Sequence, residues 1–151
     1  MNSNLSDLKA ETLRFFCLHW NRESIGNTPP EWSEPYTFVG PVPNHEKQGV
    51  YALLASNDVC YIGVGASRNY GKYAGHGLGA RLNKYLRVRE GKRNIRDSER
   101  PYQLINQWKE KGIDQIFTLG FEKEQSYLSY ALEVFLIIRF PHLHNIIKPG
   151  Q

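Results

Sequence analysis

The sequence has few cysteines, and this absence narrows the class of protein. Among 151 residues only Cys17 and Cys60 occur. Two cysteines permit one disulfide but do not require it, and we favour two reduced thiols packed among apolar neighbours in a cytoplasmic protein. No group of Cys and His residues has the spacing of a zinc finger.

Long apolar runs are also absent. No stretch reaches the roughly 18 apolar residues that a membrane-spanning helix needs. The most apolar run covers residues 132–138, and it contains Glu133. The first residues carry no basic segment ahead of an apolar one, so they do not resemble a signal peptide. We therefore expect a cytoplasmic chain with no membrane partner.

The glycine-rich stretch at 63–79 lacks the two common nucleotide-binding patterns. Five residues separate Gly65 from Gly71, where a P-loop has four, and Tyr73 stands where a Ser or Thr is required. The spacing Gly75-His-Gly77-Leu-Gly79 does not match G-x-G-x-x-G either. We expect this stretch to be a flexible lid or an insertion that contacts a ligand.

Positive charge is concentrated in one segment. The chain has a net charge of +4, whereas residues 81–100 alone carry +5. Such a patch is typical of proteins that bind a phosphate backbone, and the alternative is an ordinary solvated basic surface. The basic residues are Arg81, Lys84, Arg87, Arg89, Lys92, Arg93, Arg96 and Arg100.

Apolar periodicity predicts three strands and four helices. The strands are expected at 49–55, 59–64 and 116–121, with turn residues 56–58 between the first two. The helices are expected at 4–21 (capped by Ser3 or Ser6), 79–89, 101–111 (ended by Gly112) and 125–140. Residues 22–48 hold five of the eight prolines and predict an extended connector, and residues 144–147 a short extended end.

Two tyrosines are expected to share one face of the predicted hairpin. If Ala55 pairs with Val59 across a three-residue turn, Tyr51 faces Gly63, and Tyr61 is its diagonal neighbour. The glycine leaves space for a water or a phosphate oxygen beside the two phenols. The alternative is that tyrosine simply favours strands.

Three further residues could carry chemistry. Arg81 and Tyr85 are four residues apart and share a helix face, where the arginine could hold a phosphate in a bidentate manner. Glu133 lies in an apolar run, where a carboxylate needs either a metal or an ion pair, with Arg139 or Arg81 as the cation.

Near the end of the chain, Asn145 could hydrogen-bond a catalytic side chain or serve only as a turn residue. His142 and His144 could form half of a metal site, but no third ligand is in view.

The order of these features resembles that of the GIY-YIG nuclease family. Nine residues separate Gly49-Val50-Tyr51 from Tyr61-Ile62-Gly63, and an arginine, a glutamate and a late asparagine follow. The resemblance covers about residues 49–147. It implies an α+β fold with a small three-stranded antiparallel sheet flanked by helices. We expect the nuclease domain at 49–151, with the N-terminal helix and proline-rich connector of 1–48 packed on it.

The resemblance implies an endonuclease that hydrolyses DNA phosphodiester bonds with a single Mg²⁺ or Mn²⁺ ion. Glu133 would be the metal ligand, and Arg81 would hold the scissile phosphate. Tyr51 and Tyr61 would position or activate the attacking water. A phenol acts as a base near neutral pH only if its pKa is lowered, which we expect the metal and Arg81 to achieve.

The remaining implied roles concern support of the site and the partner. Asn145 would support the site, and Tyr85 stands where family members carry His or Tyr. The implied partner is DNA, double-stranded or branched, and a homodimer or a partner protein would allow both strands to be cut. The alternative function is a catalytically inactive nucleic-acid-binding module on the same scaffold. The expected DNA contacts are Lys72, Lys84, Arg87, Arg89, Lys92, Arg93 and Arg96, beside the 64–80 loop.

Overall fold

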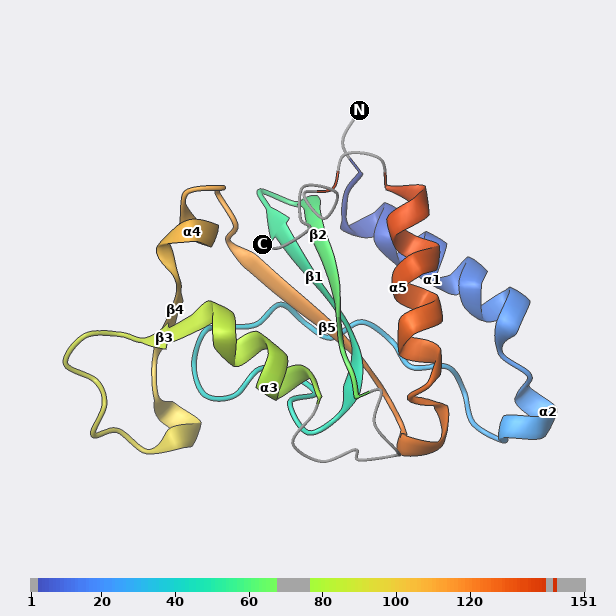
Figure 1. Cartoon of the computed structure of the whole chain (residues 1–151), viewed down its shortest axis with the longest axis horizontal. Helices are drawn as coiled ribbons and strands as arrows, with labels where there is room; N and C mark the ends of the chain where they lie inside the picture. Colours follow the sequence, from blue (N-terminus) through green and yellow to red (C-terminus); the bar gives the residue numbers. More distant parts are fainter. Residues whose placement is uncertain (1–2, 68–76, 141–142, 144–151) are drawn as a thin grey trace.

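Three antiparallel strands form the centre of the fold. The computed structural model describes residues 3–67, 77–140 and 143. In it, β1 (Gln48–Ala55) lies between β2 (Asp58–Gly65) and β5 (Gln115–Phe121) and pairs with both. Helices cover the sheet, which confirms the predicted α+β class and the three-stranded antiparallel sheet (Figure 1). Among the residues described, no helix combines the length and apolar character required to span a bilayer.

The turn between β1 and β2 is tighter than predicted. Ala55 pairs with Asp58, so only Ser56 and Asn57 form the loop. Both have positive φ angles, 48° and 73°, and two such residues match the twist of a two-residue hairpin. The predicted pairing of Ala55 with Val59 is therefore wrong.

A bulge restores the predicted register further along the hairpin. It lies between Leu53 and Leu54, and beyond it Tyr51 is opposite Gly63. The bulge places one extra residue on β2, which shifts the pairing by one position. The two-residue turn is therefore compatible with the predicted pairing of Tyr51 with Gly63.

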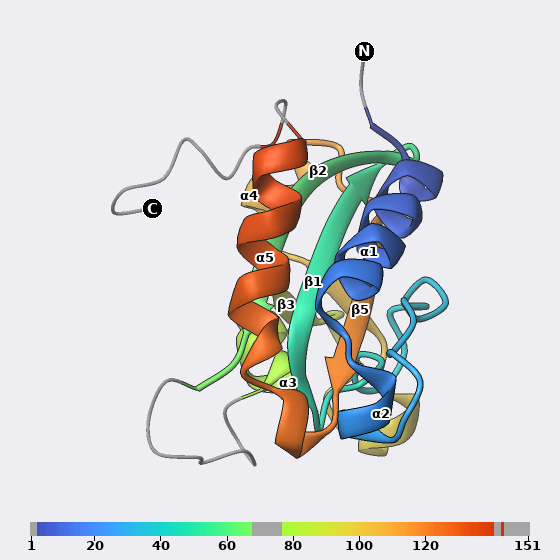
Figure 2. The ribbon, with the colours of Figure 1, turned by 90° about the vertical axis from the view of Figure 1, so that its right-hand side faces the viewer.

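The sheet separates two apolar layers. On one face, alternate β1 residues such as Val50 and Ala52 pack with α1 (Leu5–His19) and α5 (Leu128–Arg139). Figure 2 shows these two helices side by side over that face. On the other face, Tyr51 and its neighbours pack with the short helix α3 (Leu78–Leu82). Because successive side chains of β1 point to opposite faces of the sheet, alternate β1 residues belong to the two layers.

Helix α1 begins with a reciprocal cap. The Asn4 side chain accepts a hydrogen bond from the Asp7 N–H at 3.0 Å, and the Asp7 carboxylate accepts one from the Asn4 N–H at 2.9 Å. Asn4 therefore caps the helix instead of the predicted Ser3 or Ser6, since only Asn4 has an acid three residues later that completes the box.

The segment predicted as a helix at 79–89 divides into three elements. After α3, a 3₁₀ turn η1 covers Asn83–Tyr85 and the strand β3 covers Leu86–Val88. β3 pairs with β4 (Tyr102–Leu104). This pairing across the intervening loop outweighs the helix propensity of the Leu, Lys and Arg residues.

The helix predicted at 101–111 is correspondingly short. β4 takes its first residues, so α4 covers only Asn106–Lys109. Gly112 ends the segment with a φ of 79°, as predicted. The remaining short elements are α2 (Arg22–Ile25) and the 3₁₀ turns η2 (Asp97–Glu99) and η3 (Lys123–Gln125).

The proline-rich connector lies along the free edge of β5. The Ser33 N–H donates to the Thr118 carbonyl at 2.8 Å, and the Tyr36 N–H donates to the Ile116 carbonyl at 2.9 Å. The side chains of Trp32 and Tyr36 are buried. These contacts satisfy backbone groups of an edge strand that would otherwise be open to pairing with other chains.

The two cysteines are free, as favoured from the sequence, but only one is shielded. Cys60 on β2 is half-buried and Cys17 on α1 is exposed. The expectation of two core thiols is wrong for Cys17, because the face of α1 that carries it turns to solvent.

Thr118 joins the connector to β5, which gives a test of the fold. Its buried hydroxyl donates to the Pro43 carbonyl at 2.7 Å and accepts from the Asn44 amide at 3.0 Å. Thr118→Val keeps the shape but leaves both partners unsatisfied, and we expect the free energy of unfolding to fall by about 2 kcal/mol. Urea unfolding measures this change, with exposed Thr37→Val as the control; a loss below about 0.5 kcal/mol would show that these bonds do not hold the connector.

Candidate active site

Tyr51 occupies the centre of an aromatic cluster on the α3 face of the sheet. Its side chain is fully buried, and its ring stacks on that of Tyr61 with 5.9 Å between centroids and 22° between planes. A Cβ atom at Gly63 would overlap the Tyr51 ring and hydroxyl. The Tyr51 ring therefore fills the space over Gly63, and the expectation that a water or a phosphate oxygen lies in this gap is wrong. The predicted placement of the two phenols on one face is confirmed.

Two residues that follow the glycine-rich loop reach Tyr51. The hydroxyl of Tyr85 lies 3.1 Å from that of Tyr51, and the Arg81 side chain also hydrogen-bonds Tyr51. The predicted proximity of Arg81 and Tyr85 is confirmed, although Tyr85 belongs to a 3₁₀ turn. The hydrogen bond to Tyr51 raises the pKa of Arg81, so the site carries a permanent positive charge on an exposed side chain.

Exposure divides the cluster into an inner and an outer part. Tyr51 is sealed from solvent, whereas Tyr61 and Tyr85 are only half-buried and Arg81 is exposed. A ligand on the surface can therefore contact the outer three residues. Tyr51 can act only through them, by fixing where their polar atoms lie.

Trp108 supports the outer phenols, and sequence reasoning missed it. Its buried ring lies edge-on at 5.2 Å from the ring of Tyr61 and 5.3 Å from that of Tyr85, at 71° in both cases. Edge-to-face contacts of this kind fix ring orientation. The contact depends on α4 returning beside β2, which no residue spacing in the sequence signals.

Burial controls the titration of the two stacked phenols. It is the largest cause that raises the pKa of both Tyr51 and Tyr61, and the nearby Tyr85 phenol raises the pKa further. Arg81 acts in the opposite direction but has a smaller effect. Arg81 alone therefore does not bring the pKa of either phenol below its ordinary value, and both are neutral near pH 7. That a metal and Arg81 together lower a tyrosine pKa stays a prediction.

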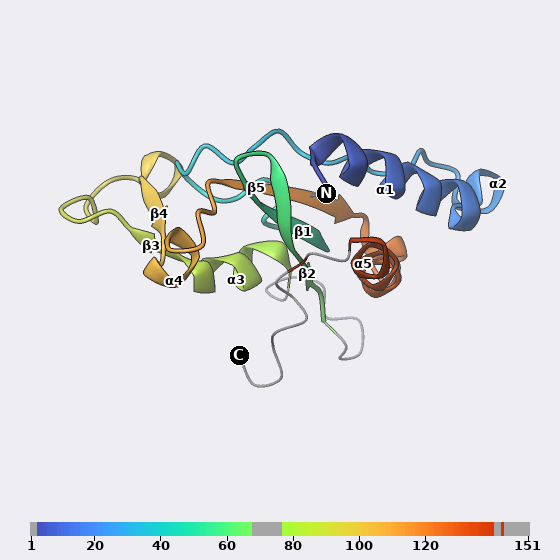
Figure 3. The ribbon, with the colours of Figure 1, turned by 90° about the horizontal axis from the view of Figure 1, so that it is seen from above.

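Glu133 lies on α5, across β2 from Arg81. Figure 3 shows α3 and α5 on either side of β2. Glu133 is half-buried, and Ser129 and Tyr130 are one turn earlier on the same side of the helix. The Tyr130 hydroxyl donates to the Ala66 carbonyl just after β2 at 2.9 Å, so this side of α5 faces the end of β2.

Two neighbouring residues are relevant to whether Glu133 binds a metal or forms an ion pair. Arg139, one of the two cations considered for an ion pair, lies 3.0 Å from Glu11 on α1. The Ser129 hydroxyl is fully buried and has no hydrogen-bond partner among the described residues. The side of α5 that carries Glu133 is thus distinct from the side that pairs with α1, and the Ser129 hydroxyl on it is sealed from solvent.

Some predicted site residues lie outside the described residues. These are Asn145, Lys72 and the pair His142 and His144. Within residues 3–67, 77–140 and 143, no three His, Cys, Asp or Glu side chains gather as a ready-made metal site.

The other predicted nucleic-acid contacts lie on η1, β3 and the loop to β4. This loop projects from the body beyond β3 (Figure 1). Six of the seven predicted side chains are described, and all six are exposed: Lys84, Arg87, Arg89, Lys92, Arg93 and Arg96. Arg87 also donates to the Asn106 side chain at 3.0 Å, so the more distant loop residues are the freer ones to meet phosphates.

Arg100 maintains the shape of this loop. Its guanidinium donates to the carbonyls of Arg93 and Ile95 at 3.3 and 3.1 Å and pairs with Asp97 at 2.7 Å. Arg100 is therefore structural, whereas the side chains around it remain available to solvent.

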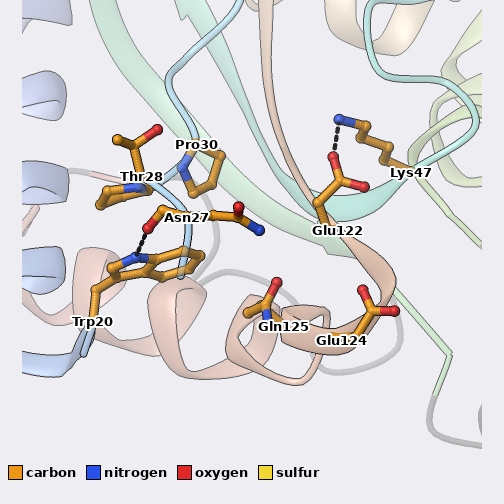
Figure 4. Close-up of a pocket in the computed structure, with 9 residues that line it drawn as sticks. Trp20, Asn27, Thr28, Pro30, Lys47, Glu122, Glu124 and Gln125 are labelled. Atoms are coloured by element: carbon orange, nitrogen blue, oxygen red, sulfur yellow. Dashed lines mark hydrogen bonds and ion pairs between the residues drawn. The ribbon is translucent and has the colours of Figure 1, made fainter. Parts of the chain in front are cut away.

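A separate cavity of about 540 Å³ opens beside Trp20 (Figure 4). Lys47 pairs with Glu122 there at 2.8 Å, and Glu124 also lines it. None of the predicted site residues lines this cavity. Its two carboxylates disfavour a phosphate ligand, so the tyrosine cluster remains the candidate site.

The burial of Tyr51 predicts a pH dependence of stability. In the folded protein the Tyr51 phenol keeps a proton that it releases near pH 10 in the unfolded chain. This contribution to the free energy of unfolding is therefore fully present below about pH 10 and is lost as the pH rises above it. Tyr51→Phe removes this proton, and we expect its decline above pH 10 to be shallower than in the wild type. Urea unfolding between pH 8 and about 11 measures the slopes, and equal slopes would show that Tyr51 titrates normally.

Comparisons of the chain with family models, curated proteins and solved structures found no match. Its function must therefore be inferred from the chemistry and geometry of its own residues.

Proposed function

We propose that this chain is a GIY-YIG-type endonuclease that hydrolyses DNA phosphodiester bonds with one divalent metal ion. The observation that carries the proposal is the arrangement around Tyr51. Its hydroxyl joins Arg81 and Tyr85, and its ring stacks on Tyr61. Residues far apart in the sequence thereby place a guanidinium and two half-exposed phenols at one surface, beside the edge strand β2.

This surface suits a phosphodiester. The Arg81 guanidinium is a donor fork that can bind two oxygens of one phosphate and stabilise the extra negative charge of the transition state. Tyr61 and Tyr85 present phenol hydroxyls that can orient a water molecule by hydrogen bonding. Tyr51 is a positioning residue, because it is buried and fixes these outer groups without touching the ligand.

Glu133 is the proposed metal ligand. It supplies one half-buried carboxylate beside an unsatisfied buried Ser129 hydroxyl. Mg²⁺ commonly binds through one or two carboxylates together with waters and substrate phosphates, so a single glutamate fits this mode of binding. A bound Mg²⁺ or Mn²⁺ would polarise the phosphate and lower the pKa of a bound water. Asn145 is the proposed supporting amide.

The proposed DNA partner rests on the charge of the β3–β4 loop. Arg89, Lys92, Arg93 and Arg96 are exposed side chains that can bind consecutive phosphates. They follow β3, which begins directly after Tyr85. A backbone bound along the loop would therefore pass close to Arg81. Double-stranded or branched DNA is the proposed substrate.

A cleavage assay with Glu133→Gln tests the proposal. Plasmid, branched and single-stranded DNA are incubated with the protein and Mg²⁺ or Mn²⁺. We expect the wild type to cut at least one substrate and Glu133→Gln to lose roughly 100-fold or more of the rate, since the amide keeps the shape but loses the charge. DNA binding by the variant should persist.

Matched variants separate the alternatives. Glu124→Gln removes an exposed carboxylate elsewhere and should cut normally, while Arg93→Glu with Arg96→Glu should weaken binding and its salt dependence. If Glu133→Gln cuts as fast as the wild type, the metal role is wrong. If the wild type binds DNA but cuts nothing with either ion, the chain is an inactive nucleic-acid-binding module.

A further inference from the structure

The outward face of α5 is entirely apolar. Its exposed residues are Tyr127, just before the helix, and then Ala131, Val134 and Ile138. The three large side chains expose 68, 53 and 72% of their surface. A helix at a protein surface normally presents charged or polar residues to water, so a solvent-facing stripe made only of apolar residues indicates a covering partner.

The spacing of this α5 stripe (Tyr127, Ala131, Val134, Ile138) is suited to another helix. The steps of four, three and four residues are those of a coiled-coil seam. The stripe is also close to symmetric when reversed, because large residues stand at its two ends and smaller ones in the middle. We infer that it packs antiparallel on the same stripe of a second copy, about a two-fold axis between Ala131 and Val134.

Such pairing is self-complementary. Tyr127 would lie against the partner's Ile138, and Ala131 against the partner's Val134. The small Ala131 side chain allows the two helices to approach closely at the crossing. An isologous contact of this kind closes on itself and yields a dimer without further growth.

The groove beside the stripe provides space for the partner's end residues. It measures about 500 Å³ and lies between α1 and α5. The stripe itself forms one wall, and Phe15, His19 and Phe135 also line it. Figure 2 shows the two helices that border it. The partner's Tyr127 or Ile138 side chain could enter this groove, so that α1 and α5 of both copies form a four-helix arrangement.

The stripe alone supplies only part of the area that a stable dimer needs. The stripe exposes on the order of 400 Å² of apolar surface, about half of the roughly 800 Å² per partner in a standard interface. The groove walls and Leu18, which is 61% exposed and follows Phe15 by three residues, can supply much of the rest.

Charge also favours association through this face. α1 carries two acidic and two basic residues, and α5 carries one of each, with histidine neutral. The helices therefore have no net charge, although the chain as a whole carries +4. The basic β3–β4 loop lies at the other end of the molecule (Figure 1), so two copies can meet without strong repulsion. The inference does not depend on the proposed nuclease activity.

Sedimentation equilibrium of the full chain tests the dimer. We expect a mass of twice 17.4 kDa at micromolar concentration. Val134→Glu with Ile138→Glu should weaken association at least tenfold, because it would bury four carboxylates per dimer. Leu13→Glu changes an equally exposed residue on the other side of α1 and should leave the mass unchanged. A monomer at every concentration would overturn the inference.

Disulfide trapping tests the antiparallel arrangement without burying a charge. In a Cys17→Ser background, Tyr127→Cys and Ile138→Cys chains are mixed and oxidised. We expect a covalent dimer in the mixture and far less with either variant alone. Cross-linking of each variant with itself, or of none, would overturn the proposed arrangement.

Discussion

The packing of the Tyr51 ring over Gly63 is the constraint on which the candidate site depends. The β-bulge between Leu53 and Leu54 sets the register that brings the two residues opposite each other. A shift of one residue would turn Tyr51 to the α1–α5 face of the sheet. In the observed register its hydroxyl meets Arg81 and Tyr85 at one point, and the chain thereby builds a polar site from otherwise ordinary strand residues.

Burial gives the tyrosines different roles. Tyr51 is sealed in the core, and the cost of placing a charge there raises the pKa of its phenol. It is therefore a rigid hydrogen-bonding support, while Tyr61 and Tyr85 are partly open to solvent. The ring of Trp108 packs edge-on against both of these outer rings. The Tyr51 cluster thus lies on the α3 face of the sheet, whereas the proposed metal ligand Glu133 belongs to α5, which covers the other face.

The sequence predicted the central strands because their patterns are local. Alternating apolar residues identified β1, β2 and β5, and the spacing of Tyr51, Gly63 and Tyr61 placed the phenols on one face. The β3–β4 pair was missed because it forms between residues separated by a long loop, where local helix propensity is misleading. Trp108 was missed for the same reason: its contacts arise from tertiary structure alone.

A crystal structure of Glu133→Gln bound to a short DNA duplex would test whether the cluster around Tyr51 binds a DNA phosphate. We expect one phosphate in hydrogen-bond contact with the Arg81 guanidinium, next to the half-exposed hydroxyls of Tyr61 and Tyr85, with the neighbouring backbone along the β3–β4 loop. Well-ordered DNA on that loop, with no phosphate near Arg81 or the tyrosine cluster, would contradict it.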